Sequence, residues 1–190
     1  MDVTRKPLIS ICIPVFNGEN FIKDCLNSII LQTYKNFEVI IVDNNSNDKT
    51  LQIVKSFNDS RIKIYSNQKN IGAINNFTKC IELATGEYFV MIPHDDIMHQ
   101  NFINETYDIL NKNKNVGIVY AGVDYIDENK NIIKKAINYN TDMHFKKHET
   151  INDIVKNFMP IQLPMVRTSI LKKIGKFDEE YSLFYDVNLW

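Results

Sequence analysis

The chain alternates between short, wholly apolar runs and longer segments in which apolar residues recur every three or four positions. The apolar runs have the length and β-branched composition of buried strands. The periodic segments have the spacing of amphipathic helices. In the first half of the chain, strands are predicted at 8–14, 37–43, 61–66 and 87–92. The helices predicted beside them cover 19–32, a segment that starts near Ser46 and Asp48, 73–84 and 100–112.

Strict alternation of strand and helix over the first 115 residues favours an α/β fold, in which a mostly parallel central sheet has helices on both faces. The strand at 61–66 is polar at alternate positions, so it is expected near an edge of that sheet. The rest of the chain is predicted to form, in order, a strand segment at 116–127, a turn at 127–131, a returning strand, a helix at 148–158, a strand at 163–169 and a short helix at 169–174.

Length and charge narrow the class of protein. A chain of 190 residues suits one domain with a real core. Its 22 basic and 23 acidic residues give a net charge of −1, without the basic surplus of a nucleic-acid binder. No apolar run approaches membrane-spanning length, and the first residues lack the apolar region of a signal peptide. We therefore expect a cytoplasmic protein with no nucleic-acid partner.

The three cysteines, Cys12, Cys25 and Cys80, show no C-x-x-C spacing. Each lies in an apolar strand or helix pattern. They are expected to be buried free thiols in a reducing compartment.

Polar side chains follow three of the predicted strands, where ligands bind in open α/β sheets. The first strand ends in Pro14–Val15–Phe16–Asn17, the second in Asp43–Asn44–Asn45, and the fourth in His94–Asp95–Asp96. These three strand ends offer an aromatic ring, side-chain amides and a pair of carboxylates. Together these groups suit a nucleobase, a ribose and a metal-bound diphosphate.

The usual phosphate-binding devices are missing. The chain has six glycines, and neither G-x-G-x-x-G nor G-x-x-x-x-G-K-[ST] occurs in it. A diphosphate would then need a carboxylate-held divalent cation, Mn²⁺ or Mg²⁺. Asp95 and Asp96 repel each other, and such an ion would relieve the repulsion. The alternative is a solvated loop in which Asp96 caps the next helix.

Three segments carry a family resemblance: "SICIPVFNGENFIKDCLNSIILQTYKNFEVIIVDNNSNDKT", "NIGAINNFTKCIELATGEYFVMIPHDD" and "IGKFDEEYSLFYDVNLW". They resemble the inverting glycosyltransferases of family 2, which have the Rossmann-like GT-A fold. The resemblance implies transfer of a sugar from a nucleotide diphosphate, usually UDP, to an acceptor hydroxyl with inversion. It implies a glycan or lipid-linked acceptor, and a place in surface polysaccharide, lipopolysaccharide or glycan assembly.

The resemblance also assigns roles to individual residues. Asp186 corresponds to the general base that takes the proton of the acceptor hydroxyl. Asp95 and Asp96 correspond to the metal site, where a cation offsets the charge on the leaving diphosphate. The implied donor-nucleotide contacts are Pro14, Phe16, Asn17, Asp43, Asn44, Asn70, His94 and Asp95.

The chain departs from the family pattern at several positions. Pro93 stands where an acid is common, and His94 is the residue that would take over part of its role. Asn44 also replaces a frequent acid, Phe77 a frequent arginine, and Tyr185 a glutamate. The chain ends at Trp190, inside a helix that the family normally continues.

These departures set the expected domain organisation. We expect a single catalytic domain over 1–190 that lacks its C-terminal part. Residues 1–115 form its nucleotide-binding half, and 116–190 its acceptor-side half. We also expect the protein to associate peripherally with the inner face of the membrane and to form a homodimer.

Two other functions stay open. A non-catalytic fragment that binds nucleotide sugars fits Pro93 and the early end of the chain. A sugar-1-phosphate nucleotidyltransferase also uses a parallel sheet and metal-binding acids, but it needs a glycine-rich, basic N-terminal loop that "PVFNGEN" does not provide.

Overall fold

The computed structural model describes residues 6–135 and 164–175. The chain divides into two compact units, one made of Met1–Val119 with Met165–Trp190 and the other of Tyr120–Pro164. The helix expected at 148–158 lies outside the described residues.

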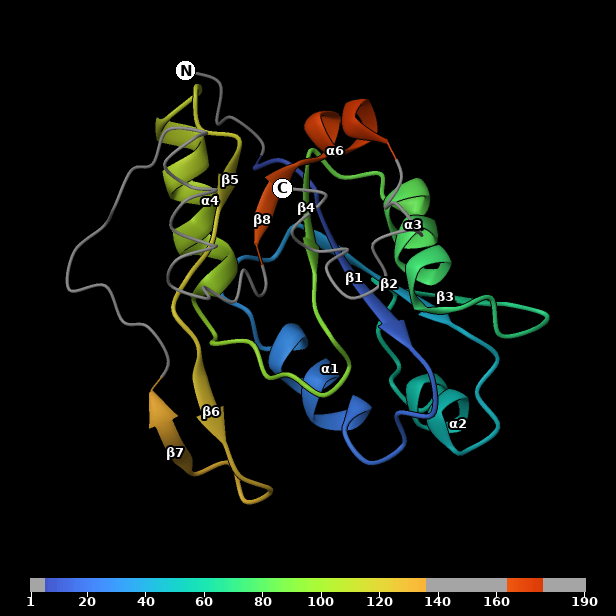
Figure 1. The fold of residues 1–190 in the computed structure, drawn as a ribbon. Helices are drawn as coiled ribbons and strands as arrows, with labels where there is room; N and C mark the ends of the chain where they lie inside the picture. The colour runs from blue at the N-terminus through green and yellow to red at the C-terminus, as the bar shows by residue number, and fades with distance from the viewer. Residues whose placement is uncertain (1–5, 136–163, 176–190) are drawn as a thin grey trace. The chain divides into compact units, whose positions relative to one another are not determined.

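A six-stranded sheet in the order β3-β2-β1-β4-β8-β5 forms the centre of the first unit (Figure 1). Its strands are β1 (Ile9–Val15), β2 (Phe37–Asp43), β3 (Ile62–Ser66), β4 (Tyr88–Met91), β5 (Ile118–Val119) and β8 (Met165–Arg167). The first four run parallel, whereas β8 is antiparallel to both of its neighbours. The mostly parallel sheet is thus confirmed, and β3 lies at its edge as its alternating polarity predicts.

Five helices accompany this sheet within residues 6–135 and 164–175. They are α1 (Ile22–Ile30), α2 (Thr50–Lys55), α3 (Ala73–Leu83), α4 (Phe102–Lys112) and, after β8, α6 (Thr168–Ile174), so that five carry labels in Figure 1.

 α1 begins three residues later than the periodicity predicts. α2 begins at Thr50, whose amide donates to Asp48 Oδ1 (2.9 Å).

Helices cover both faces of the sheet, because successive residues of a strand point to opposite sides. Phe89 of β4 belongs to a core cluster that includes Leu171 of α6 and residues of α3. Its neighbour Tyr88 points the other way and meets Tyr107 of α4 edge to face, with 5.7 Å between ring centroids. Figure 1 shows α3 and α6 on one side of the strands and α4 on the other.

The three cysteines are buried and form no disulfide, as predicted. The Cys12 thiol lies 3.5 Å from the carbonyl oxygen of Cys80. Burial raises the pKa of the Cys12 and Cys25 thiols. Because a thiol reacts as its thiolate, both are unreactive core residues.

The strand predicted at 116–127 is wrong as a single element. Ile118–Val119 forms β5 in the central sheet, and Asp124–Ile126 forms a separate strand, β6. The residues between them include Ala121 and Gly122, which have low strand propensity.

The second unit contains the predicted hairpin, in which β6 pairs with β7 (Ile132–Lys135). Asp127 shapes the turn, because its Oδ1 accepts the amides of Asn129 (2.9 Å) and Asn131 (2.8 Å). The turn and the returning strand are confirmed.

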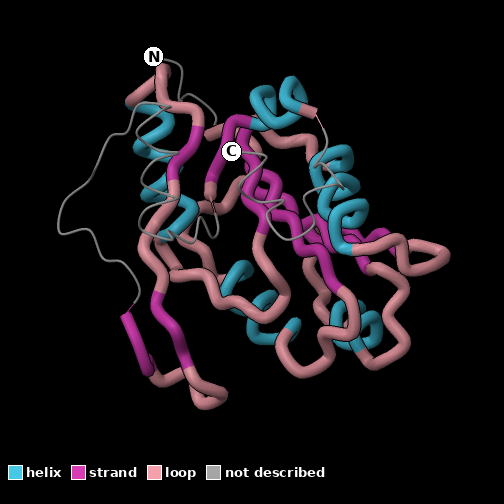
Figure 2. The backbone as a smooth tube through the Cα atoms, viewed as in Figure 1, coloured by secondary structure: helices cyan, strands magenta, loops and turns pink. Residues whose placement is uncertain are grey.

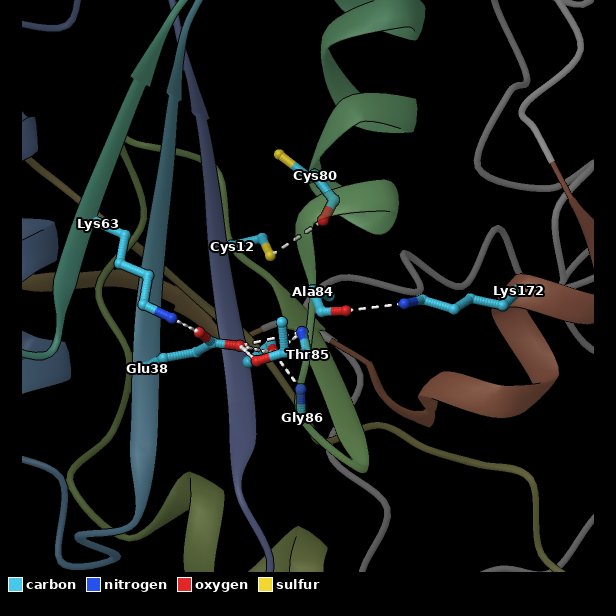
Figure 3. Close-up of polar contacts among 9 residues, drawn as sticks. Cys12, Glu38, Lys63, Cys80, Ala84, Thr85, Gly86 and Lys172 are labelled. Carbon is cyan, nitrogen blue, oxygen red and sulfur yellow. Dashed lines mark hydrogen bonds and ion pairs between the residues drawn. The ribbon is translucent and has the colours of Figure 1, made fainter.

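A buried carboxylate joins β1, β2 and the turn before β4 near the amino ends of these strands (Figure 3). Glu38 is 4% exposed. Its oxygens accept hydrogen bonds from the Ser10 hydroxyl (2.6 Å), the Thr85 hydroxyl (2.6 Å) and amide (3.0 Å), and the Lys63 ammonium group (2.6 Å). Gly86 completes the cluster by donating its amide to Ser10 Oγ (2.8 Å). This cluster ties the strands together at their amino ends, opposite to the carboxyl ends that carry the predicted site residues.

Arg167 holds the end of α4 against β8. Its guanidinium donates to the carbonyl oxygens of Leu110 (2.6 Å), Val116 (2.9 Å) and Asn113 (3.2 Å). The Leu110 carbonyl lies in the final turn of α4, where a backbone carbonyl has no partner within the helix, and the arginine supplies the missing donor. The Asn113 carbonyl also accepts the Val116 amide (3.1 Å), so Arg167 is its second donor.

We expect Arg167→Met to lower the free energy of unfolding by about 2 kcal/mol, because three carbonyl groups lose a charged donor at once. Urea denaturation measures the change. The matched control is Lys172→Met, which removes a single bond to the carbonyl oxygen of Ala84 (2.9 Å, Figure 3) and should cost about 0.5–1 kcal/mol. Equal losses in the two variants would contradict the role given to Arg167.

Candidate functional site

The site begins where β1 and β4 stop pairing. The last contact of this pair is the bond from the Ile92 amide to the carbonyl oxygen of Cys12 (2.9 Å). Backbone groups of a strand point alternately to its two sides, so Pro14, two residues after Cys12, faces the same side. Proline has no N–H to donate there. Pro14 is buried and remains in register with Val42 of β2. Its missing N–H therefore ends the pairing with β4 but not the pairing with β2.

The loops after β1, β2 and β4 leave the same edge of the sheet (Figure 2). Five hydrogen bonds tie the first of these loops to the second. They run from Asn17 N to Ser46 Oγ (2.9 Å), Asn47 N to Asn17 Oδ1 (3.0 Å), Gly18 N to Thr50 Oγ1 (2.8 Å), Glu19 N to Asp48 Oδ2 (3.0 Å) and Lys49 N to Glu19 Oε2 (2.9 Å). Phe16, which is 44% exposed, is presented at the start of this fixed loop.

Two asparagines allow these loops to turn. Asn17 and Asn45 have φ angles of 51° and 66°, a left-handed conformation that asparagine tolerates better than most residues. The side-chain oxygen of Asn17 is engaged by Asn47, so this predicted nucleotide contact also holds the loop together.

Asp43 ends β2 and is 1% exposed. Its two carboxylate oxygens share one donor, the Ser46 amide, at 3.2 and 3.3 Å. A carboxylate has about four lone-pair positions. Asp43 therefore keeps acceptor capacity for a further donor.

Asn44, 3% exposed, uses every hydrogen-bonding position of its side-chain amide. Nδ2 donates to Asn70 Oδ1 (2.9 Å) and to the carbonyl oxygen of Gly72 (3.3 Å). Oδ1 accepts from Asn67 Nδ2 (3.0 Å) and from the amide of Ile71 (2.9 Å). No position of this amide is left for the edge of a base.

A wider set of amides surrounds Asn44. Asn67 Nδ2 also donates to Asn76 Oδ1 (2.9 Å), and Asn76 Nδ2 donates to the carbonyl oxygen of Val42 (2.9 Å). The four side chains Asn44, Asn67, Asn70 and Asn76 are called the amide network below. It joins the ends of β2 and β3 to the loop before α3 and to α3 itself.

The two acids after β4 differ in their surroundings. Asp95 is exposed and Asp96 is half-buried. Burial raises the pKa of Asp96, and the neighbouring charge of Asp95 raises it further. The pair is therefore destabilised in its doubly ionised form, which is a condition that a bound cation would relieve.

His94 brings this loop against the loop after β1. A Cβ atom added to Gly18 would lie 2.5 Å from His94 Cδ2, so the imidazole occupies the space above the bare glycine. The loops that follow β1 and β4 are thus in contact through Gly18 and His94.

The donor set at this edge fits a hard divalent cation. Among the residues that the structure describes, no group of three or more His, Cys, Asp or Glu side chains converges on one point. Mg²⁺ and similar ions are commonly held by one or two carboxylates, with substrate phosphates completing the shell. Asp95 and Asp96 match that pattern.

The structure brings nearly all the predicted site residues to one edge of the sheet. Those at this edge are Pro14, Phe16, Asn17, Asp43, Asn44, Asn70, His94, Asp95 and Asp96. Asp186, the predicted general base, lies outside the described residues. Sequence reasoning missed Asn67 and Asn76. Burial of Asn76 could have been predicted, because it lies four residues before Cys80 and so shares the buried face of α3.

Two solved structures of glycosyltransferases have a similar fold. The alignment with TarS from S. aureus in complex with UDP covers 95% of this chain and 53% of the TarS chain, with a TM-score of 0.71 and 21% identity. The mannosyltransferase PcManGT from Pyrobaculum calidifontis, in complex with GDP-Man and Mn²⁺, matches 92% of this chain and 48% of its own (TM-score 0.68, 18% identity). The fold is the GT-A fold of nucleotide-sugar glycosyltransferases.

The chain belongs to glycosyl transferase family 2, whose profile matches residues 10–175. An uncharacterized glycosyltransferase of Rickettsia typhi is 34% identical over 98% of this chain and 58% of its own length. The UDP-Glc:alpha-D-GlcNAc-diphosphoundecaprenol beta-1,3-glucosyltransferase WfgD of Escherichia coli is 31% identical over 70% of this chain and 54% of its own length. The chain thus spans somewhat more than half the length of these relatives.

No helix in the described part of the chain is both long and apolar enough to cross a membrane.

Proposed function

We propose that this chain transfers a sugar from a UDP-sugar to an acceptor hydroxyl with inversion, with the help of Mn²⁺ or Mg²⁺. The observation that carries the proposal is the position of Asp95 and Asp96, which follow β4 where it separates from β1. Ligands of open α/β sheets bind at such a switch point.

The proposed division of labour follows the three strand ends. Phe16 packs against the base, and Asp43 accepts the imide N–H of uracil with its remaining lone pairs. Asp95 and Asp96 hold the ion against the donor diphosphate. A bound cation supplies positive charge to the leaving group as negative charge develops there.

Asp186 is the proposed general base. It takes the proton of the acceptor hydroxyl while the hydroxyl oxygen attacks the anomeric carbon. The bond from that carbon to the diphosphate oxygen breaks on the opposite face, which releases UDP and inverts the centre. The proposed acceptor is a glycan or lipid-linked saccharide, the kind of acceptor that the name of WfgD describes. Residues 1–190 then serve as one catalytic domain, with its nucleotide half at 1–115.

We expect UDP to raise the melting temperature more than ADP or GDP at equal concentration with Mn²⁺, because Asp43 accepts a hydrogen bond that the uracil imide donates. Differential scanning fluorimetry measures the three shifts. Asp43→Asn should reduce the preference for UDP, since a neutral amide is a weaker acceptor than a carboxylate. Equal shifts for the three nucleotides would remove the uridine assignment and leave a general nucleotide site.

Turnover separates catalysis from binding alone. A panel of UDP-sugars, assayed for hydrolysis or transfer with Mn²⁺, should release UDP with at least one donor. Binding without release by any donor would favour the non-catalytic fragment.

A further inference from the structure

The amide network is a buried polar assembly at the base side of the proposed site. Asn44, Asn67 and Asn76 are each less than a tenth exposed. Buried amides cost free energy unless they are hydrogen-bonded, and such networks hold their members in one arrangement only when nearly all positions are satisfied.

The bonds of the network converge on Asn67. Both of its Nδ2 protons are donated within the network, to Asn44 and Asn76. Its Oδ1 accepts the ammonium group of Lys79, a half-buried residue of α3, at 2.6 Å. Its backbone amide donates to the carbonyl oxygen of Asp43 (2.9 Å). Asn67 thus touches the residue that is proposed to read the base.

The network also fixes the loop before α3. Asn44 Oδ1 accepts the Ile71 amide, and Asn70 Oδ1 accepts both the Gly72 amide (2.9 Å) and Asn44 Nδ2. Gly72 has a φ of 82°, which other residues rarely adopt, so the turn needs glycine here and the hydrogen bonds to Asn44 and Asn70 hold its conformation. The loop cannot shift without breaking bonds to Asn44.

We propose that the amide network and Lys79 position Asp43 and residues 70–72 for the nucleotide, and that Asn44 acts through this network rather than as a ligand of the base. The inference rests on the proposed function. It makes Asn67, Asn76 and Lys79 positioning residues, and it keeps Asp43 as the residue that accepts a hydrogen bond from the base.

Asn67→Asp is the variant that tests the proposal. It has the same shape and keeps an acceptor for Lys79, but it loses the donations to Asn44 and Asn76. We expect the affinity for UDP to fall about tenfold, the equivalent of roughly 1.4 kcal/mol of lost preorganisation. Calorimetry with Mn²⁺ at 10 °C measures the affinity of folded protein. The matched control is Gln68→Glu, an exposed neighbour of Asn67 that adds the same charge outside the network and should leave the affinity unchanged.

Amide hydrogen exchange supplies a readout that needs no nucleotide. The Ile71 and Gly72 amides should be protected in the wild-type protein and should exchange faster in Asn67→Asp, but not in Gln68→Glu. Unchanged UDP affinity in folded Asn67→Asp that has lost this protection would overturn the positioning role.

A second pair of variants keeps the test decisive if Asn67→Asp does not fold. Lys79→Met removes the donor to Asn67 Oδ1, whereas Lys79→Arg retains one. UDP affinity and Ile71 protection should both fall in the first and recover in the second, and no difference between them would overturn the proposal. If the wild-type protein binds no nucleotide while its Ile71 protection still depends on Asn67, the proposed function fails and the network stands as a structural element.

Discussion

Asp95→Asn is expected to remove most of the metal-dependent affinity for UDP. In the wild-type protein, Mn²⁺ and UDP should each strengthen the binding of the other, because the ion offsets the charges of both the acids and the diphosphate. Loss of one carboxylate ligand should weaken UDP binding in the presence of Mn²⁺ by about tenfold to a hundredfold. Calorimetric titrations with and without Mn²⁺ measure the effect, which should nearly vanish in the absence of metal.

Asp186→Asn is the matched control, since it makes the same chemical change at the other proposed acid. It should leave UDP and metal affinity nearly unchanged, while lowering turnover by about a hundredfold or more, the usual scale for the loss of a general base. Unaltered affinity and metal dependence in Asp95→Asn would mean that the acidic pair is a solvated loop. His94, which lies against the loop after β1, would then be the first alternative ligand to test.

Glu38→Gln is expected to lower the free energy of unfolding at pH 7 by about 2–3 kcal/mol. The amide replaces a buried carboxylate that accepts four hydrogen bonds. The NH₂ group of the glutamine would face the N–H and O–H groups that donate to the carboxylate, and it cannot accept from them. Chemical denaturation measures the loss. Lys63→Met, which removes only the partly exposed partner, should cost less than about 1 kcal/mol.

The effect of Glu38 should depend on pH with a definite sign. Burial alone would raise the pKa of Glu38, but the hydrogen bonds from Lys63, Ser10 and Thr85 outweigh it and bring the pKa down from 4.5 to about 2. A carboxyl group with a lowered pKa in the folded state stabilises the protein fully above pH 4.5 and loses this contribution as the pH falls toward 2. The difference between wild type and Glu38→Gln should shrink over that range. A difference that stays constant down to pH 2 would contradict the assignment.

Much of the fold could be predicted from the sequence, because the strands that carry the site are buried on both faces. β1, β2 and β4 are continuous apolar runs, and such runs between helical patterns define a parallel sheet. The stretch 116–127 was harder to interpret. Its apolar residues continue across Ala121 and Gly122, and only pairing with β8 shows where β5 ends.

The candidate site was predictable in place but not in detail. Residues at the carboxyl ends of parallel strands must meet at one edge, so the location of Asp43 and Asp95 at this edge could be predicted from element order alone. Whether an amide faces a ligand or another amide depends on contacts between segments far apart in sequence. Asn44 lies 23 residues from Asn67 in the chain, and nothing in the local pattern indicates that the two are bonded.

Pro14 affects the free-energy cost of binding a ligand at the carboxyl ends of β1 and β4. In a sheet that stayed paired to its last residue, opening a space between β1 and β4 would break backbone hydrogen bonds, each worth about 1 kcal/mol net. Here the backbone pairing of β1 with β4 already ends at the bond between the Ile92 amide and the Cys12 carbonyl, because Pro14 has no hydrogen to donate. Glu38 and its partners meanwhile secure the far edge of the same strands. A ligand bound at the loops beyond this point would therefore break no backbone hydrogen bond between β1 and β4.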